Sequence, residues 1–326
     1  MNDNLPDTSA TATESFPTSK LRSKFWAVGG GKGGIGKSII SLNLAYWLAK
    51  LKQNVVLVDA DLGGANLHTL MGIKFVKYTL TDYLNKRVKT LDEIAIPTPI
   101  KGLRLICGAS DIVGLANPKY LQKKKLLKAL QGMDADHLIM DLGAGTDYNT
   151  LDFFLNCSYK IAVITPQPTA MQNGYGFIKS ALYRSITKTF ANNTLLTPLI
   201  RRATDPNAKQ VIASMNELVT LFSKVDPDHE KRLQNLINGF HIYLISNMVK
   251  TDRDRRSAWI LKTVIQKYLN LEHISVVKSI PFDPQIEDSV GSMKPAFITK
   301  PGSQSALAFY ELVHSIIKKE QSSAGG

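Results

Sequence analysis

A glycine-rich stretch near the N-terminus constrains the fold of this chain more than any other feature. It reads GGGKGGIGKS and spans Gly29–Ser38. An aromatic and β-branched run, Phe25–Val28, precedes it, and an apolar periodic run, Ile39–Leu48, follows it. The first composition favours a strand and the second favours a helix. The segment therefore predicts a strand, a glycine loop and a helix in that order.

The same stretch fits the phosphate-binding pattern G-x-x-x-x-G-K-[ST], in which Lys37 and Ser38 are the last two residues. Glycines allow backbone N–H groups to turn inward around phosphate oxygens, and the following helix points its positive end at the same anion. In such a P-loop the lysine contacts the β and γ phosphates and the serine hydroxyl binds Mg²⁺. The residues expected to bind nucleotide here are Gly31, Gly33, Gly34, Ile35, Gly36, Lys37 and Ser38.

A dinucleotide site is the alternative interpretation of these glycines. Gly31, Gly33 and Gly36 also satisfy G-x-G-x-x-G, and Asp59 lies at a suitable distance for a ribose contact. A dinucleotide site, however, needs neither a phosphate-binding lysine nor a magnesium-binding hydroxyl after the last glycine. The Lys-Ser pair therefore favours the P-loop.

Three aspartates close two apolar runs that read as buried parallel strands. Asp59 and Asp61 follow Val55–Val58, and Asp141 ends His137–Asp141, which is followed by a glycine loop. Open α/β sheets place their ligand crevice at the carboxyl ends of strands. We therefore expect these carboxylates to serve magnesium and water, with Asp141 as the Walker B residue.

A second lysine in the loop, Lys32, resembles the deviant Walker A signature of the MinD/ParA family of ATPases. The resemblance covers roughly residues 24–186 and 241–319, through the motifs KGGIGKS, DADLGGANL, DLGAG, PQPT and IPFDP. It implies an ATPase that uses ATP and Mg²⁺ and forms a homodimer in the ATP state. In such a dimer Lys32 reaches the partner's ATP, Asp61 orients the attacking water and Asp59 supports the magnesium shell.

The resemblance also implies where the base binds. An asparagine at a strand end contacts the adenine in this family, which makes Asn247 the candidate here, although a turn-forming asparagine is the alternative. The loop of IPFDP flanks the base, which adds Pro281 and Asp283 to the predicted site. The predicted catalytic residues are Lys32, Lys37 and Asp61, and the predicted metal-binding residues are Ser38, Asp59 and Asp141.

Alternating strands and helices predict a three-layer α/β/α sandwich with a mostly parallel sheet. We expect a disordered tail at 1–20, a P-loop ATPase domain at 21–320 and a flexible tail at 321–326. Residues 187–240 look like a helical insertion at the rim of the sheet, and Val276–Asp283 is expected to be the last strand and its exit. No separate C-terminal membrane anchor is evident after the expected final helix, Ser303–Lys319.

The net charge of +13 permits binding to nucleic acid or to anionic lipid without proving either. The consecutive lysines Lys123–Lys125 favour a solvated helix face over a nucleic-acid patch. Cys107 and Cys157 form no C-x-x-C pair, so we expect small core residues, no metal cluster and a reducing cytoplasm.

Three classes of function remain at this stage. The first is an ATPase that positions the division site or flagellum, with a protein activator or cargo. The second is a ParA-like partition ATPase that binds DNA non-specifically. The third, a metallocentre-maturation ATPase, is disfavoured by the cysteine pattern. Peripheral contact with the inner face of the membrane also stays open.

Overall fold

The computed structural model describes residues 23–61, 64–108, 120–205, 207–291 and 302–324. The predicted N-terminal tail lies outside these residues. Within the described chain, helices and strands alternate from Lys24 onward.

The centre of the molecule is a sheet whose described strands number eight, in the order β3-β4-β2-β5-β1-β6-β7-β8. Every described pairing is parallel except that of β3 with β4, so the expectation of a mostly parallel sheet is confirmed. The strand bounds are β1 Lys24–Gly29, β2 Val55–Ala60, β3 Ala95–Pro97, β4 Leu103–Ile106, β5 His137–Leu142, β6 Tyr159–Ile164, β7 Ile242–Ser246 and β8 Ile274–Val276.

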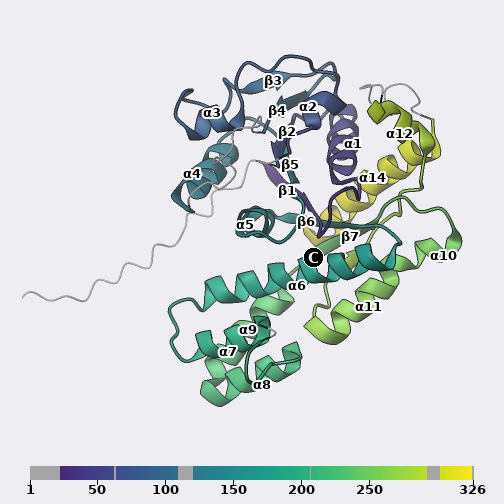
Figure 1. The fold of residues 1–326 in the computed structure, drawn as a ribbon. Helices are drawn as coiled ribbons and strands as arrows, with labels where there is room; N and C mark the ends of the chain where they lie inside the picture. The colour runs from purple at the N-terminus through teal and green to yellow at the C-terminus, as the bar shows by residue number, and fades with distance from the viewer. Residues whose placement is uncertain (1–22, 62–63, 109–119, 206, 292–301, 325–326) are drawn as a thin grey trace, which may run out of the picture.

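Helices cover both faces of the sheet, as the three-layer prediction requires. On one face α1 (Lys37–Lys50) and α14 (Gln304–Ala324) pack side by side (Figure 1). The other face is covered by α3 (Leu80–Leu84), α4 (Tyr120–Gln131), α5 (Tyr148–Asn156), α6 (Pro168–Thr189) and α11 (Ser257–Leu269). The short helices are α2 (Leu67–Leu70), α10 (Asp252–Arg255) and α12 (Pro284–Gly291).

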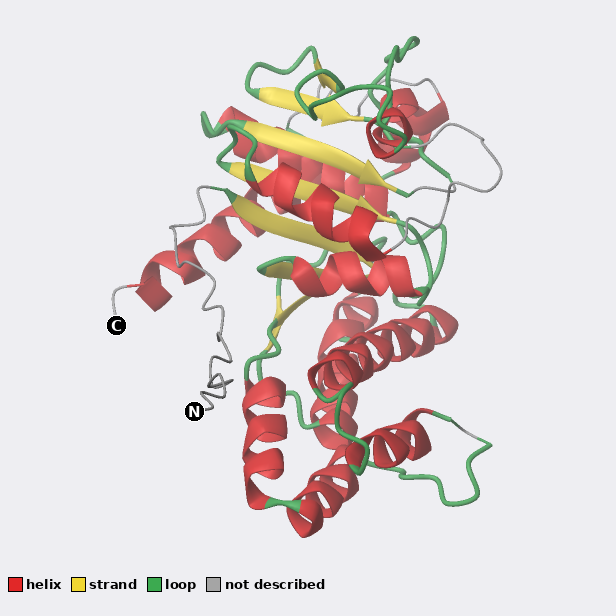
Figure 2. Ribbon diagram, turned by 90° about the vertical axis from the view of Figure 1, so that its left-hand side faces the viewer, coloured by secondary structure: helices red, strands yellow, loops and turns green. Residues whose placement is uncertain are grey.

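Three further helices form a lobe that extends beyond the sheet. They are α7 (Leu196–Thr204), α8 (Met215–Val225) and α9 (Pro227–Asn238), which pack on one another and on α6 (Figure 2). Phe222 is fully buried inside this lobe, where its ring meets that of Phe190 edge-on at 5.1 Å. These helices occupy the segment that the sequence indicates as an insertion.

Two local expectations differ from the structure. The last strand ends at Val276 rather than beginning there, and Val276–Asp283 is mostly an irregular exit with one bridge, between Val249 and Pro281. The ladder between β7 and β8 ends at the pair of Leu244 with Val276, so the residues after Val276 leave the strand. Among the helices that the structure describes, none has both the length and the apolar character needed to cross a bilayer.

Candidate functional site

The glycine loop between β1 and α1 adopts backbone conformations and close contacts that favour glycine. Gly34 and Gly36 have φ angles of 74° and 86°, in the left-handed region that side chains with a Cβ rarely occupy. A Cβ on Gly36 would lie 2.2 Å from the Asn247 amide nitrogen, and one on Gly31 would lie 2.1 Å from the Asn173 carbonyl oxygen. Conformation and close packing thus both require glycine in this loop.

Lys37 is the first residue of α1 and is buried, with 8% of its surface exposed. Its Nζ lies 3.5 Å from the carbonyl oxygen of Lys32. Burial lowers the pKa of Lys37, while the carboxylates of Asp141 and Asp61 act in the opposite direction. Those two carboxylates lie close enough to stabilise the charged ammonium group inside the protein.

Asp59 and Asp141 lie opposite each other on neighbouring strands, because β2 and β5 pair in parallel with these two residues in register. Burial, followed by the charge of Asp141, raises the pKa of Asp59 to about 7. Burial raises the pKa of Asp141 to about 6, although hydrogen bonds from the Ser38 and Ser41 hydroxyls favour its ionised form. The folded protein therefore holds two carboxyl groups that a cation would help to ionise.

Asp61 lies beside the loop that follows β5. A Cβ on Gly143 would lie 3.2 Å from Asp61 Oδ1, and one on Gly64 would lie 3.4 Å from Asp61 Oδ2. The Asp61 backbone N–H donates to Asp59 Oδ1 over 3.2 Å. Asp61 thus lies beside Gly64 of its own loop and Gly143 of the loop after β5.

The oxygen groups at this strand edge suit Mg²⁺. The residues that the structure describes contain no group of three or more His, Cys, Asp or Glu side chains that could enclose a metal by themselves. Mg²⁺ does not need one, because it keeps several waters and is commonly bound through one or two carboxylates and substrate phosphates. Ser38, Asp59 and Asp141 supply a hydroxyl and two buried carboxyl groups, which fits that requirement.

The predicted base-binding residues lie on two neighbouring loops. Asn247 is buried and donates its side-chain amide to the Ile35 carbonyl of the glycine loop over 2.9 Å. Pro281 follows β8 and pairs with Val249, two residues after Asn247. Asp283 accepts from the Gln285 backbone N–H and from the Ser305 hydroxyl, which ties α12 to α14. The structure therefore places Asn247 in contact with the P-loop. The hydrogen bonds of Asp283 given above are made instead with the first residues of α12 and α14.

Lys32 is exposed at the tip of the loop. A cavity of about 410 Å³ opens beside the neighbouring Gly31, between the loop after β5 and the first half of α6. Its lining includes Gly145, Thr146, Gln172 and Asn173. This cavity therefore borders the loop that is predicted to bind phosphate.

Sequence analysis missed two parts of the site. The Ser41 hydroxyl donates to Asp141 Oδ1 over 2.9 Å, and the Leu67 backbone N–H donates to Asp59 Oδ2 over 3.1 Å. Ser41 lies three residues after Ser38 on α1, so helical spacing placed it on the same face. The contact from Leu67 depends on the path of the chain after Asp61, for which the sequence carries no comparable signal.

The lysine run Lys123–Lys125 is only partly solvated. Lys124 and Lys125 are exposed, but Lys123 is 7% exposed and its Nζ lies 2.6 Å from Asp152 Oδ2. The prediction of a solvated face was therefore wrong for Lys123, because α5 places a carboxylate against that position of α4. Cys107 and Cys157 are both buried, and burial raises the pKa of each thiol to about 12.

Comparison with known proteins extends this description. The family described as ParA, NUBPL iron-transfer P-loop NTPase, matches residues 22–179. The antiactivator FleN of Pseudomonas aeruginosa is 34% identical over 155 residues, and the flagellum site-determining protein YlxH of Helicobacter pylori is 37% identical over 174 residues. The chain belongs to the MinD/ParA family of P-loop ATPases.

The matched regions cover 47% and 51% of this chain and 54% and 56% of FleN and YlxH, about half the length of each relative. Among solved structures, MinD from Pyrococcus horikoshii in complex with Mg-ADP has a TM-score of 0.62 and 21% identity, covering 90% of this chain and 96% of that one. The MinC:MinD complex of Aquifex aeolicus has a TM-score of 0.58 and 15% identity, covering 91% and 96%. At these identities the structures show the shared fold.

Proposed function

We propose that this protein is an Mg²⁺-dependent ATPase that dimerises on binding ATP and positions a cellular structure, the division site or the flagellum. One observation carries the proposal. The glycine loop, Lys37 and the three carboxylates Asp59, Asp61 and Asp141 converge at the carboxyl edge of the sheet. A P-loop with paired strand-end carboxylates is the arrangement that phosphoryl transfer requires.

Each of these residues has a distinct role in the proposed reaction. The glycine loop and Lys37 bind the phosphates, and Asn247, Pro281 and Asp283 border the base. Asp61 orients the attacking water. Lys37 and the partner's copy of Lys32 stabilise the charge on the transferring phosphoryl group, a contribution that can reach about 10³–10⁵ in rate. Mg²⁺, when held by Ser38, Asp59 and Asp141, supplies charge neutralisation between the phosphates.

The cellular role is inferred from the relatives. FleN and YlxH are named for flagellar regulation and placement, and MinD for septum placement. We propose the same kind of work for this protein in the cytoplasm, through a dimer that binds a protein activator or cargo. Iron transfer is a weaker candidate, because both cysteines are buried and their thiols are held protonated.

Gel filtration with light scattering tests this proposal. Wild type should become a dimer with ATP and Mg²⁺ and return to a monomer as ATP is hydrolysed. Asp61→Ala should bind ATP, dimerise and fail to release phosphate, whereas Lys37→Ala should lose ATP binding about a hundredfold or more because a buried phosphate contact disappears. An Asp61→Ala protein that stays monomeric in saturating ATP would refute the dimer switch.

DNA partition is the second candidate, supported by the net charge of +13. Binding of Asp61→Ala to random duplex DNA, measured across a salt series with ATP or ADP, separates the two. ATP-specific binding that weakens steeply with salt would indicate a phosphate footprint assembled by the dimer. Absence of DNA binding in both nucleotide states would leave the positioning function.

A further inference from the structure

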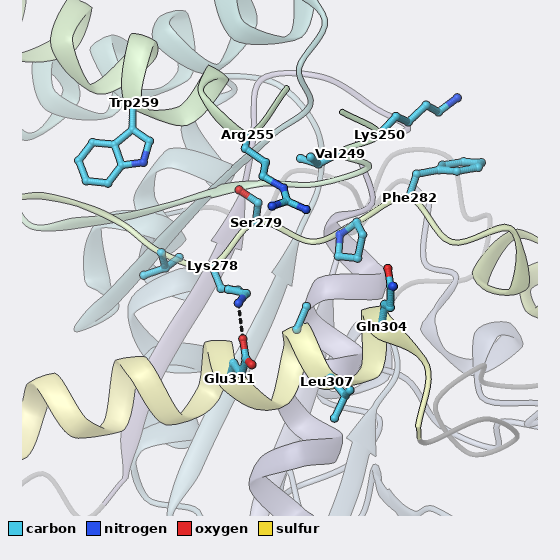
Figure 3. Close-up of a pocket in the computed structure, with 13 residues that line it drawn as sticks. Val249, Lys250, Arg255, Trp259, Lys278, Ser279, Phe282, Gln304, Leu307 and Glu311 are labelled. Carbon is cyan, nitrogen blue, oxygen red and sulfur yellow. Dashed lines mark ion pairs between the residues drawn. The ribbon is translucent and has the colours of Figure 1, made fainter. Parts of the chain in front are cut away.

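A groove of about 710 Å³ opens at the outer edge of the sheet, beside β8 (Figure 3). We call it the edge groove. The first turns of α14 form one wall, α10 and the start of α11 form another, and the chain after β8 forms the floor. No residue of the glycine loop lines it, so it is separate from the phosphate site, although its lining includes Pro281, which we propose to border the base.

The edge groove exposes bulky apolar side chains. Trp259 is 56% exposed, Leu307 51% and Phe282 37%. Figure 3 shows Trp259 at one end of the groove and Phe282 at the other, with Leu307 below. Large exposed apolar side chains that gather around a concave surface are typical of sites that bind a partner. Single exposed apolar residues scattered over a surface are common and indicate no such site.

The charges of the edge groove are mostly positive. Lys250, Arg255 and Lys278 line it together with one carboxylate, Glu311, which pairs with Lys278. Arg255 also pairs with the exposed Asp252 of its own helix over 3.3 Å, a contact that a partner's carboxylate would compete with. Lys250 lies over the Phe282 ring at 4.3 Å. In Figure 3 the Arg255 guanidinium lies between the two aromatic ends, close to Ser279. A ligand that fits would therefore carry a carboxylate between two bulky apolar groups.

The floor of the groove continues an open sheet edge. β8 is the last strand in the order of the described sheet, and Val277, Lys278 and Ser279 directly after it line the groove. An extended segment can add to such an edge through main-chain hydrogen bonds, while pockets receive its alternate side chains. The geometry thus favours an extended peptide over a compact small molecule.

We propose that the edge groove binds an extended segment of a protein partner, with an acidic residue held by Arg255 between two bulky apolar residues. The apolar residues contact Trp259 and Leu307 on one side and Phe282 on the other. Nothing in this recognition requires nucleotide.

The same loops connect the edge groove to the nucleotide site. The Val249 N–H donates to the Ile280 carbonyl, and the Phe282 N–H donates to the Val249 carbonyl, over 3.0 and 2.9 Å. Two residues before Val249, Asn247 contacts the glycine loop. Peptide binding and ATP binding should therefore influence each other reciprocally. This extension rests on the proposed ATP site, whereas the groove itself does not.

Fluorescence anisotropy with the full chain tests the groove. The probe is a labelled peptide with the core Leu-Ser-Glu-Ser-Phe, whose alternate side chains face one way when extended. Its control carries Lys in place of Glu. In the absence of nucleotide the Glu peptide should bind and the Lys peptide should not. Arg255→Glu should weaken binding about tenfold to a hundredfold, because a charge-assisted contact becomes repulsive.

Further variants keep the test decisive if Arg255→Glu perturbs α10. Trp259→Ala should weaken the Glu peptide by about tenfold through lost apolar contact. Arg253→Glu changes the charge of the same helix outside the groove and should leave the affinity within about twofold. Equal binding of the two peptides, or an equal loss in Arg253→Glu, would overturn the proposal. The proposal would also be overturned if the protein bound neither peptide but bound duplex DNA, and if Arg255→Glu abolished that DNA binding.

The link to nucleotide is measured separately. The Glu peptide is titrated into Asp61→Ala with and without ATP, and we expect its affinity to change by about fivefold or more. Lys37→Ala should retain the nucleotide-free affinity and lose the ATP effect. If the ATPase proposal is wrong, the titration without nucleotide still tests whether the edge groove binds the peptide. If only the peptide-binding proposal is wrong, the measurements of ATP-dependent dimerisation are unaffected.

Discussion

Buried carboxylates occur in two regions of this protein, and their surroundings differ in charge. At the nucleotide site, Asp59 and Asp141 lie opposite each other, and their pKa values are raised to about 7 and about 6. Between α4, α5 and α6, Asp152 is equally buried, yet its pKa is lowered to about 2. Burial raises the pKa in all three cases, so neighbouring groups make the difference.

Three cations surround Asp152. Lys123 of α4 lies 2.6 Å away, Arg184 of α6 lies 3.0 Å away and Lys188 of α6 lies 3.4 Å away. Burial by itself raises the pKa of Asp152, but these cations and their hydrogen bonds more than offset it. Arg184 also lies over the Tyr148 ring at 4.3 Å. Three cations therefore surround one carboxylate, and their contacts tie three helices together.

The nucleotide site has the opposite balance. The charges of Asp141 and Asp61 act on the buried ammonium group of Lys37, and the carboxyl group of Asp59 lies near both of these aspartates. Carboxylates that repel one another inside a protein destabilise it unless they hold a proton or a cation. The contrast teaches that a buried carboxyl group surrounded by cations joins the helices that carry them, whereas buried carboxyl groups that outnumber their cations suit the binding of a cation.

The largest stability effect should come from removing the carboxylate of the Asp152 cluster. Asp152→Ala leaves Lys123, Arg184 and Lys188 without their shared partner and should lower the free energy of unfolding by about 3–5 kcal/mol. Urea denaturation followed by circular dichroism measures this. Asp92 pairs with Arg104 at 3.2 Å on the surface, so Asp92→Ala is the control and should cost at most about 1 kcal/mol. Equal losses in the two variants would contradict the contrast.

The pH dependence of stability sharpens the comparison. Asp59 binds its proton more tightly in the folded state than in the unfolded state, so its contribution is full below about pH 4 and decreases as the pH rises toward 7. Without nucleotide and Mg²⁺, the free energy of unfolding should therefore fall between pH 5 and pH 8. Asp152 stays ionised throughout this range and contributes no slope, since its own contribution is lost only as the pH falls from about 4 toward 2.

Asp59→Asn isolates this effect. Asparagine resembles the protonated carboxyl group, so the variant should gain on the order of 2 kcal/mol relative to wild type on going from pH 5 to pH 8. Thermal or urea unfolding in a chelating buffer at both pH values measures the gain. An unchanged pH slope in Asp59→Asn would show that the raised pKa of this carboxyl group does not control the stability.

The smallest effect separates two adjacent lysines. Lys123→Met removes one of three cations from Asp152 and should cost about 1–2 kcal/mol, because a hydrogen bond to a charged group is lost. Lys124→Met changes an exposed residue and should stay within about 0.5 kcal/mol. Both are measured by urea denaturation. A larger loss in Lys124→Met than in Lys123→Met would contradict the assignment of Lys123 as the lysine of α4 that stabilises Asp152.

Much of the fold follows from local patterns. Apolar runs closed by aspartate predict buried parallel strands, and glycines before Lys37 predict a phosphate loop, because strand burial and loop conformation impose local requirements on residue type. The limits of the last strand could not be obtained in this way, because they depend on where the ladder with β7 ends. That ladder ends at Val276, and the bridge of Val249 with Pro281 lies outside the strands. The antiparallel β3 was missed for a similar reason, because three residues carry too little periodicity.

The sequence by itself determined the order of strands and helices, the glycine loop and the placement of Asp59, Asp61 and Asp141 at strand ends. Only the tertiary structure decided that β2 and β5 pair Asp59 with Asp141, that Lys123 is buried against Asp152 and that the edge groove lies beside β8. The reason is physical. Periodicity specifies which face of an element is apolar. The contacts of Lys123 with Asp152 and of Ser41 with Asp141, which join residues 29 and 100 positions apart, depend on how those faces pack.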